Sequence, residues 1–232
     1  MTPTTPRTVL VVAAHPDDEV LGCAGTVARW VREGATAHTL ILGEGETSRY
    51  ATRAAGLAQQ HALVGLRAAA QGAAATIAAT SVRVLSFPDN RFDTVSLLDL
   101  AKAVEAVVAD VRPDVVLTHY RGDLNVDHRR TFEAVLTACR PFPGTPVRAI
   151  LSFETPSATE WNVPSIFAPT YYVDIAQTFA VKLDALRKYD REMRPFPHPR
   201  SYEAIEALAK WRGATAGVHA AEAFEVVRLV IL

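Results

Sequence analysis

The chain lacks the features that mark several classes of protein. Of its 232 residues only two are cysteines, Cys23 and Cys139, and they form no C-x-x-C pair. Lysine plus arginine (24) nearly equals aspartate plus glutamate (25), so no basic field indicates nucleic acid or a membrane surface as a partner. No apolar run is long enough to span a membrane, and residues 1–7 do not resemble a signal peptide. These absences predict a cytoplasmic protein with reduced thiols, and they leave its oligomeric state open, including a homo-oligomer.

The composition that remains is that of an ordinary globular protein, with 49% hydrophobic and 21% charged residues. The length suits one large α/β domain or two small ones. No internal repeat, low-complexity tract or change in composition divides the chain. We therefore expect a single domain over residues 1–232.

Strand and helix patterns alternate along the chain. Short, β-branched apolar runs predict strands, and apolar residues at every third or fourth position predict helices. This rhythm predicts an α/β fold with a Rossmann-like, mainly parallel sheet covered by helices on both faces. From about residue 140 the rhythm loosens into an elaborated C-terminal part. The expected strands are 8–13, 36–42, 82–87, 114–118, 147–154, 171–175 and 224–232, and the expected helices are 20–33, 51–71, 97–110, a stretch from 131, 181–193 and 202–212.

The densest group of reactive side chains follows the first predicted strand, in Ala14-His15-Pro16-Asp17-Asp18-Glu19. In an open α/β sheet, ligands bind at the carboxyl ends of the strands. One imidazole and three carboxylates within five residues suit a divalent metal. An acidic turn that only caps the next helix would need neither the histidine nor the additional acids.

A second group lies in the loop from His119 to Arg129, after the predicted strand 114–118. Because the carboxyl ends of parallel strands meet at one edge, His128 and Asp127 are expected to face His15 and Asp18. Two neutral imidazoles and one carboxylate form the ligand set of a catalytic zinc, which leaves one position for water or substrate. The same set also suits non-haem Fe(II) or another divalent metal.

In their order and separation, the first motif and the Asp127-His128 pair resemble those of the LmbE-like, or PIG-L-type, deacetylases. These are zinc enzymes that remove acetyl groups from compounds containing N-acetylglucosamine. Residues 88–93 and 221–224 also look like segments of that family, so the likeness covers nearly the whole chain. The resemblance implies that His15, Asp18 and His128 bind zinc and that Asp17 is the general base. Glu19 is left as an acid in the first turn of a helix.

The chemistry of such a site agrees with this interpretation. Zinc lowers the pKa of a bound water and polarises an amide carbonyl, and a nearby carboxylate that is not a ligand can carry the proton to the leaving amine. Asp127 is expected to orient His128 through its ring N–H. Many members of the family carry a histidine, thought to stabilise the oxyanion, where this chain has Asn125. Asparagine donates a hydrogen bond but no charge, so His119, His198 or His219 could compensate.

Residues on neighbouring loops are candidates for substrate binding. Arg49 and Arg91 follow the second and third predicted strands and could hold a phosphate, a carboxylate or a sugar hydroxyl, although solvated surface arginines are an equally simple interpretation. Asp123 and His119, in the second loop, are further candidates.

We predict a zinc-dependent N-deacetylase of an amino sugar in a small glycoside, glycolipid precursor or nucleotide sugar. Three alternatives remain open. The first is an amidase on the same scaffold that removes a larger acyl group. The second is an Fe(II) oxygenase, whose ligand triad is usually housed in a β jelly roll. The third is a non-catalytic sugar-binding protein that keeps the metal for structure.

Overall fold

The structure is a computed structural model and describes residues 5–163 and 166–231. Its strands are β1 (Thr8–Ala13), β2 (Thr36–Gly43), β3 (Ser81–Phe87), β4 (Val115–His119), β5 (Ala149–Phe153), β6 (Tyr171–Asp174) and β7 (Ala221–Leu229). They form one seven-stranded sheet in the order β3-β2-β1-β4-β5-β7-β6. Strands β1 to β5 pair in parallel, and β7 runs antiparallel to both β5 and β6. The predicted mainly parallel α/β fold is confirmed.

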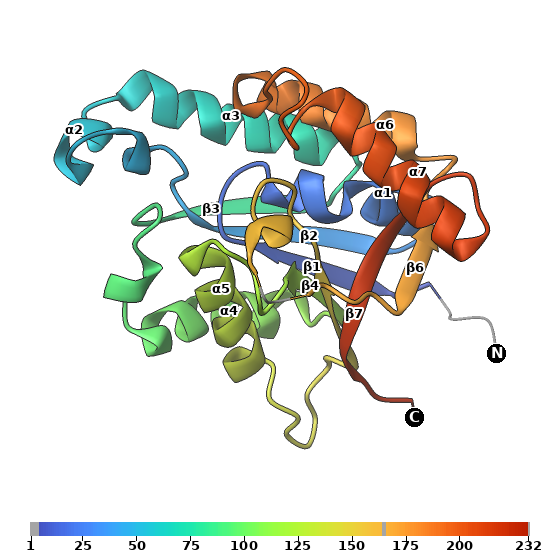
Figure 1. The fold of residues 1–232 in the computed structure, drawn as a ribbon. Coiled ribbons are helices and arrows are strands. Elements are labelled where there is room, and N and C mark those ends of the chain that lie inside the picture. The colour runs from blue at the N-terminus through green and yellow to red at the C-terminus, as the bar shows by residue number, and fades with distance from the viewer. Residues whose placement is uncertain (1–4, 164–165, 232) are drawn as a thin grey trace.

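Helices cover both faces of this sheet (Figure 1). In that view α1, α3, α6 and α7 lie above the sheet, and α4 and α5 lie below it. None of the helices in the described part of the chain is long and apolar enough to cross a membrane. The helices are α1 (Asp18–Arg32), α2 (Arg53–Leu57), α3 (Gln60–Thr76), α4 (Leu97–Val111), α5 (Val126–Ala138), α6 (Phe179–Leu186) and α7 (Tyr202–Ala216), with short 3₁₀ turns η1 (Thr47–Arg49), η2 (Phe92–Thr94), η3 (Thr159–Trp161) and η4 (Arg187–Glu192).

The sheet separates two apolar cores, and β1 contributes to both. Val9 and Val11 pack into the core beneath α1, whereas Leu10 and Val12 pack into the core on the side of α4 and α5. Successive side chains of a strand point to opposite faces, so a central parallel strand must be apolar at nearly every position. This requirement explains why the run 9–13 shows no alternation in the sequence.

The C-terminal part is tied to the first helix by a buried ion pair. Lys182 on α6 lies 2.6 Å from Glu222 on β7, and both residues are about 95% buried, with relative exposures of 4% and 5%. Lys182 also donates to the carbonyl of Leu21 in α1 at 2.8 Å. The Glu222 carboxylate accepts hydrogen bonds from the backbone N–H groups of Gly25 and Thr26. These bonds fix α1, and thus the turn that precedes it, relative to β7.

The predicted helix 51–71 is wrong as a single element. The chain forms α2 and then α3, which extends to Thr76. The Thr52 hydroxyl accepts a hydrogen bond from Ala55 N–H and so begins α2. At Gly56 the backbone approaches η1 so closely that an added Cβ would lie 2.7 Å from the Cα of Thr47. Alanine favours helix at every position, so an alanine-rich run does not show where one helix ends and the next begins.

Other boundaries differ by a few residues. The helix expected from 131 begins at Val126 because Asn125 caps it, its side chain accepting from Asp127 N–H at 2.8 Å. The helix expected over 181–193 ends as α6 at Leu186 and continues as η4. The last strand covers 221–229 rather than 224–232, and residue 232 lies outside the described residues.

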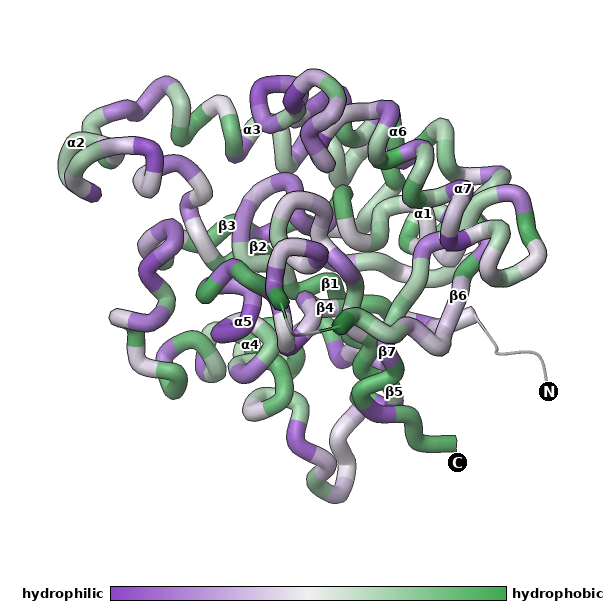
Figure 2. The backbone as a smooth tube through the Cα atoms, viewed as in Figure 1, coloured by the Kyte–Doolittle hydropathy of each residue, from purple (hydrophilic) through white to green (hydrophobic). Residues whose placement is uncertain are grey.

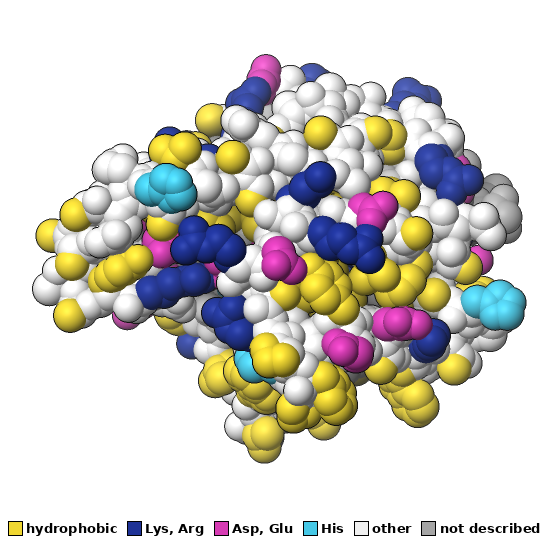
Figure 3. All heavy atoms as spheres, turned by 90° about the horizontal axis from the view of Figure 1, so that it is seen from above, with side chains coloured by type: hydrophobic (Ala, Val, Ile, Leu, Met, Phe, Trp, Pro, Cys, Tyr) yellow, Lys and Arg dark blue, Asp and Glu magenta, His cyan; other side chains and the backbone are white. Residues whose placement is uncertain are grey.

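Hydropathy follows this arrangement. In Figure 2 the central strands are largely green, and the loops that follow them carry more purple. The face shown in Figure 3 mixes basic, acidic and hydrophobic side chains, and neither sign of charge dominates it. This agrees with a formal net charge of −1.

Breaking the ion pair between Lys182 and Glu222 should destabilise the fold. We expect Glu222→Gln to lower the free energy of unfolding by about 3–5 kcal/mol, because Lys182 would remain buried without a counter-charge. Urea denaturation measures this change. The control is Arg83→Gln, which breaks an exposed pair with Asp110 and should have little effect. Equal effects from the two substitutions would contradict the prediction.

Candidate functional site

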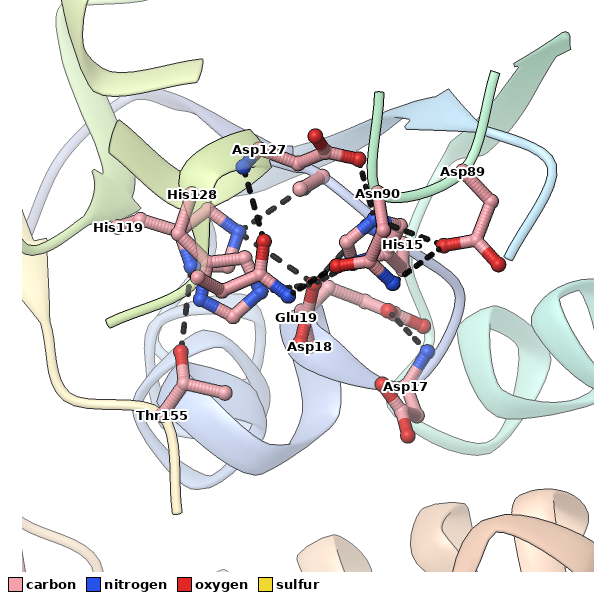
Figure 4. Close-up of polar contacts among 12 residues, drawn as sticks. His15, Asp17, Asp18, Glu19, Asp89, Asn90, His119, Asp127, His128 and Thr155 are labelled. Carbon is pink, nitrogen blue, oxygen red and sulfur yellow. Dashed lines mark hydrogen bonds and ion pairs between the residues drawn. The ribbon is translucent and has the colours of Figure 1, made fainter. Parts of the chain in front are cut away.

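A group of buried polar side chains lies at the carboxyl edge of the sheet (Figure 4). It is formed where β1, β3 and β4 end, together with the first turns of α1 and α5. Because β1 pairs with β4 in parallel, the two predicted motifs emerge side by side. The loop after β3 adds Asp89, and the first turn of α5 carries His128.

The turn after β1 has an unusual backbone. Asp17 has a φ of 105°, in the left-handed region that residues other than glycine rarely adopt. The backbone N–H of His15 donates to Asp18 Oδ2 at 2.9 Å, and that of Asp18 donates back to the His15 carbonyl at 3.3 Å. As a result, the Asp18 side chain faces the histidines, and that of Asp17 is directed towards the C-terminal loops (Figure 4).

The structure brings the three expected metal ligands together. One ligand atom from each of His15, Asp18 and His128 lies within 4.8 Å of the others. His15 Nδ1 and His128 Nε2 each lie 3.3 Å from Asp18 Oδ2. All three residues are buried.

Each of these histidines contacts a second carboxylate through its other ring nitrogen. His15 Nε2 lies 2.9 Å from Asp127 Oδ2, and His128 Nδ1 lies 3.2 Å from Asp123 Oδ1. Carboxylates placed in this way fix the tautomer and the orientation of metal-binding histidines. The expectation that Asp127 orients His128 is therefore wrong, since Asp127 contacts His15 and accepts from the backbone N–H of Phe92 instead.

Asp123 also departs from its expected role in substrate binding. Its side chain is fully buried and accepts hydrogen bonds from Thr159 Oγ1 at 2.7 Å and from the backbone N–H of Asn125 at 2.9 Å. The physical reason is that these hydrogen bonds hold the carboxylate in the interior. Asp123 thus supports His128 from within the protein.

The donor atoms fit a divalent cation. Asp18 Oδ1 and His128 Nε2 are buried and make no hydrogen bond to any residue in the described ranges, and His128 Nδ1 meets Asp123 as an ion-pair contact. Despite burial, which acts in the opposite direction, Asp18 and Asp123 raise the pKa of His128 to about 9. Likewise, despite burial, Asp127 and Asp18 raise the pKa of His15 above its usual value. The carboxylates therefore favour positive charge at this point, and a bound cation would supply it.

Asp17 stands beside this cluster but does not belong to it. Burial raises the pKa of its carboxyl to about 7, even though the guanidinium of Arg200 acts to lower it. Arg200 Nη1 donates to Asp17 Oδ2 at 2.7 Å. A carboxyl whose pKa lies close to neutrality suits a general base.

His119, a second candidate for substrate binding, is buried in the interior of the protein. Its Nε2 accepts from the backbone N–H of Ala14 at 2.9 Å, and its ring stacks on that of His128 with centroids 3.9 Å apart. Burial and the neighbouring His128 lower its pKa to about 3. A buried, neutral ring without a free donor towards the site neither binds substrate nor replaces an oxyanion-stabilising histidine here.

Asn125 uses both ends of its side chain. Its oxygen caps α5, and its Nδ2 donates to Asn90 Oδ1 at 2.9 Å. The bond to Asn90 uses one of the two N–H donors of this amide, so the second donor is left for an oxyanion.

The two candidate arginines lie on loops at the same edge but differ in their surroundings. Arg49 forms ion pairs with Glu192 and, at 3.8 Å, with Glu46. Arg91 is exposed, and its side chain contacts no ionic partner among the residues that the structure describes. Of the two, Arg91 is the one free to bind an anionic or hydroxyl group.

Sequence reasoning missed Arg200, Tyr189 and Asp89. Arg200 is 183 residues from Asp17 in the chain and follows three prolines in an irregular stretch, so no local pattern marks it. Tyr189 lies in a segment that we expected to be an ordinary helix. Asp89 Oδ1 lies 3.3 Å from His15 Nε2. The likeness of residues 88–93 to the family marked its segment, and the parallel topology, which places the ends of β1, β2 and β3 at one edge, could have indicated its position.

Known proteins resemble this chain in sequence and in fold. A model of the PIG-L family, described as GlcNAc-PI de-N-acetylase, matches residues 10–139. The uncharacterized deacetylase YaiS of Escherichia coli is 27% identical over 186 residues, covering 78% of this chain and 89% of that protein. A 1D-myo-inositol 2-acetamido-2-deoxy-alpha-D-glucopyranoside deacetylase from Rhodococcus erythropolis is 33% identical over 184 residues, covering 69% of this chain and 60% of that protein.

Among solved structures, 4-carboxy-2-hydroxymuconate hydratase from Pseudomonas putida has a TM-score of 0.74 and 21% identity, covering 97% of this chain and 98% of that one. This likeness shows the fold alone. Because a hydratase shares the fold, the reaction must be argued from the site and the family.

The arrangement predicts one divalent metal site that depends on His15, Asp18 and His128. We expect His128→Ala to abolish stoichiometric Zn²⁺ binding, and Asp123→Asn to weaken it about 10- to 100-fold because His128 loses its orienting partner. Competition with a chromophoric chelator measures both affinities. The control is His38→Ala, which removes a histidine that contacts Ser81 away from the site. One equivalent of tightly bound zinc in His128→Ala would place the metal elsewhere.

Proposed function

We propose, because the chain belongs to the PIG-L family of de-N-acetylases, that it hydrolyses the N-acetyl group of an amino sugar. The observation that carries the proposal is that two adjacent acids, Asp17 and Asp18, face different parts of the site. Asp18 faces His15 and His128, and Asp17 faces away from them while remaining next to the cluster. An amide hydrolase of this type needs both a metal-binding carboxylate and a separate base.

His15, Asp18 and His128 would hold the metal, which we propose to be zinc, although their donor set also suits Fe²⁺. When bound, such a metal lowers the pKa of water and polarises the amide carbonyl. Asp127 and Asp123 hold the two imidazoles in place through the ring nitrogens that face away from Asp18. This arrangement leaves His15 Nδ1 and His128 Nε2 as the donor atoms.

Asp17 would take a proton from the attacking water and pass it to the leaving amine. Arg200 occupies Oδ2, and Oδ1 makes no hydrogen bond to the described residues. The free oxygen is therefore the one that accepts the proton. Asn125 would stabilise the oxyanion with the N–H of Nδ2 that does not bond Asn90.

We further propose a small-molecule substrate, in which an N-acetylated glucosamine unit belongs to a glycoside, a glycolipid precursor or a nucleotide sugar. The relatives support this class: the Rhodococcus enzyme is named for an acetamido sugar linked to inositol, although this chain spans only 60% of its length. Arg91, exposed at the same edge, would hold a phosphate, carboxylate or hydroxyl of the substrate. The two buried, free cysteines suit a reducing compartment, and we propose the cytoplasm.

The first experiment measures release of the acid from N-acyl glucosamine derivatives by the metal-free and the zinc-loaded protein. We expect zinc-dependent release of acetate that falls about 10²- to 10⁴-fold in Asp17→Asn while the affinity for zinc is unchanged. Asp99→Asn, an exposed acid in the first turn of α4, serves as the matched control.

The acyl group decides between the proposal and its alternatives. Faster release of longer acids than of acetate would make the protein an amidase for larger acyl groups. Stoichiometric zinc with no release from any derivative would favour a sugar-binding protein and would refute the proposed deacetylase.

A further inference from the structure

The backbone and the side chain of Asp17 are both held by one stretch of the C-terminal part, residues 187–200. Tyr189 lies in η4, and Arg200 immediately precedes Ser201, the residue that caps α7. Arg200 contacts the carboxylate of Asp17 directly, and Tyr189 reaches its peptide N–H through Glu19. All of these contacts lie outside the metal cluster.

The hydrogen bond from Arg200 to the Asp17 carboxylate has a fixed direction because the guanidinium itself is held in place. Arg200 Nη1 donates to Asp17 Oδ2 at 2.7 Å, and Nε donates to the Ser157 hydroxyl at 2.8 Å. The Asp17 side chain is only 3% exposed and that of Arg200 only 22%. A charge-assisted bond under these conditions is stronger than one at the surface, and it fixes which oxygen remains free.

The hydrogen bonds that hold the backbone act at Asp17, whose φ is 105°. A non-glycine residue in such a conformation costs of order 1–3 kcal/mol and persists only where its surroundings hold it. The N–H of Asp17 donates to Glu19 Oε2 at 3.1 Å, and the Tyr189 hydroxyl donates to Glu19 Oε1 at 2.6 Å. Glu19 and Tyr189 are buried, so the tyrosine fixes a carboxylate that in turn fixes the peptide.

We propose that Arg200 and Tyr189 are positioning residues for Asp17, the former holding Oδ2 of its carboxylate and the latter, through Glu19, holding its backbone. The role rests on the proposed function, in which Asp17 is the base. Its consequence is that the position of Oδ1, the oxygen that Arg200 leaves free, is fixed before the substrate binds. Neither residue contacts the substrate or the metal, so both affect the rate of the chemical step and leave affinity unchanged.

The first test separates positioning from substrate binding. We expect Arg200→Gln to lower kcat about 10- to 100-fold, with KM and zinc affinity unchanged, because a misplaced base loses its alignment. Arg200→Lys should recover part of the loss, and added guanidinium should partly restore Arg200→Ala. The control is Arg194→Gln, in the same stretch. Among the described residues, the Arg194 guanidinium donates only to the carbonyls of Arg191 and Met193.

The second test asks whether the effect passes through Asp17. In the Asp17→Asn background, Arg200→Gln should change the residual rate little, since residues that act as a unit are not additive. Tyr189→Phe should lower kcat about tenfold in the parent protein, by the same loss of alignment, and little in that background. Tyr202→Phe, which removes a hydroxyl bonded to the exposed Asp190, is the matched control.

Three results would overturn the positioning role while leaving the deacetylase intact. A raised KM with unchanged kcat would make Arg200 a substrate-binding residue. An equal loss in the parent and in Asp17→Asn would show that Arg200 acts independently of the base. A fully active Arg200→Gln would show that the contact has no catalytic consequence. An inactive parent protein that binds zinc would instead overturn the proposed function, and the role of Arg200 with it.

Discussion

The burial of Asp18 between two imidazoles is the interaction on which the rest of the site depends. Removing a carboxylate from water is unfavourable unless it meets positive charge or several hydrogen-bond donors. Burial acts to raise the pKa of Asp18, but the imidazole of His128 holds that pKa well below its usual value. The His15 backbone donates a further hydrogen bond to Oδ2, whereas Oδ1 has no donor among the described residues. A cation held by Asp18, His15 and His128 would supply further positive charge.

The surrounding acids follow from the same constraint. Each ligand histidine can present only one nitrogen to the cluster, so its other nitrogen needs an acceptor, and Asp127 and Asp123 provide it. Those acids are buried too. The backbone N–H of Phe92 donates to Asp127 Oδ1, and Asp123 accepts from the backbone N–H of Asn125 at Oδ1 and from the Thr159 hydroxyl at Oδ2. The fold supplies these donors because the loops after β3 and β4 meet at one edge of the sheet. The site is thus a network in which each buried charge has a named partner.

The sequence was sufficient for the parts that depend on local pattern. The unbroken apolar run 9–13 predicted a central parallel strand, and the parallel rhythm placed the first motif beside His128. It was insufficient for the partners of the two loop acids, since Asp127 contacts His15 and Asp123 contacts His128, and these pairings depend on side-chain directions that no local pattern shows. It was also insufficient for Arg200, because a contact across 183 residues leaves no periodic trace.

The two halves of the chain therefore carry different parts of the chemistry. The match to the family model covers residues 10–139, which include every proposed metal ligand and both orienting carboxylates. The contacts that hold Asp17, the proposed base, come from Tyr189 and Arg200, beyond that range. The ion pair of Lys182 with Glu222 anchors this C-terminal part on α1, directly behind the turn that carries Asp17. Similarity over the first half of the chain thus bears on the proposed metal ligands. The orientation of Asp17, the proposed base, must be judged from the second half of the chain.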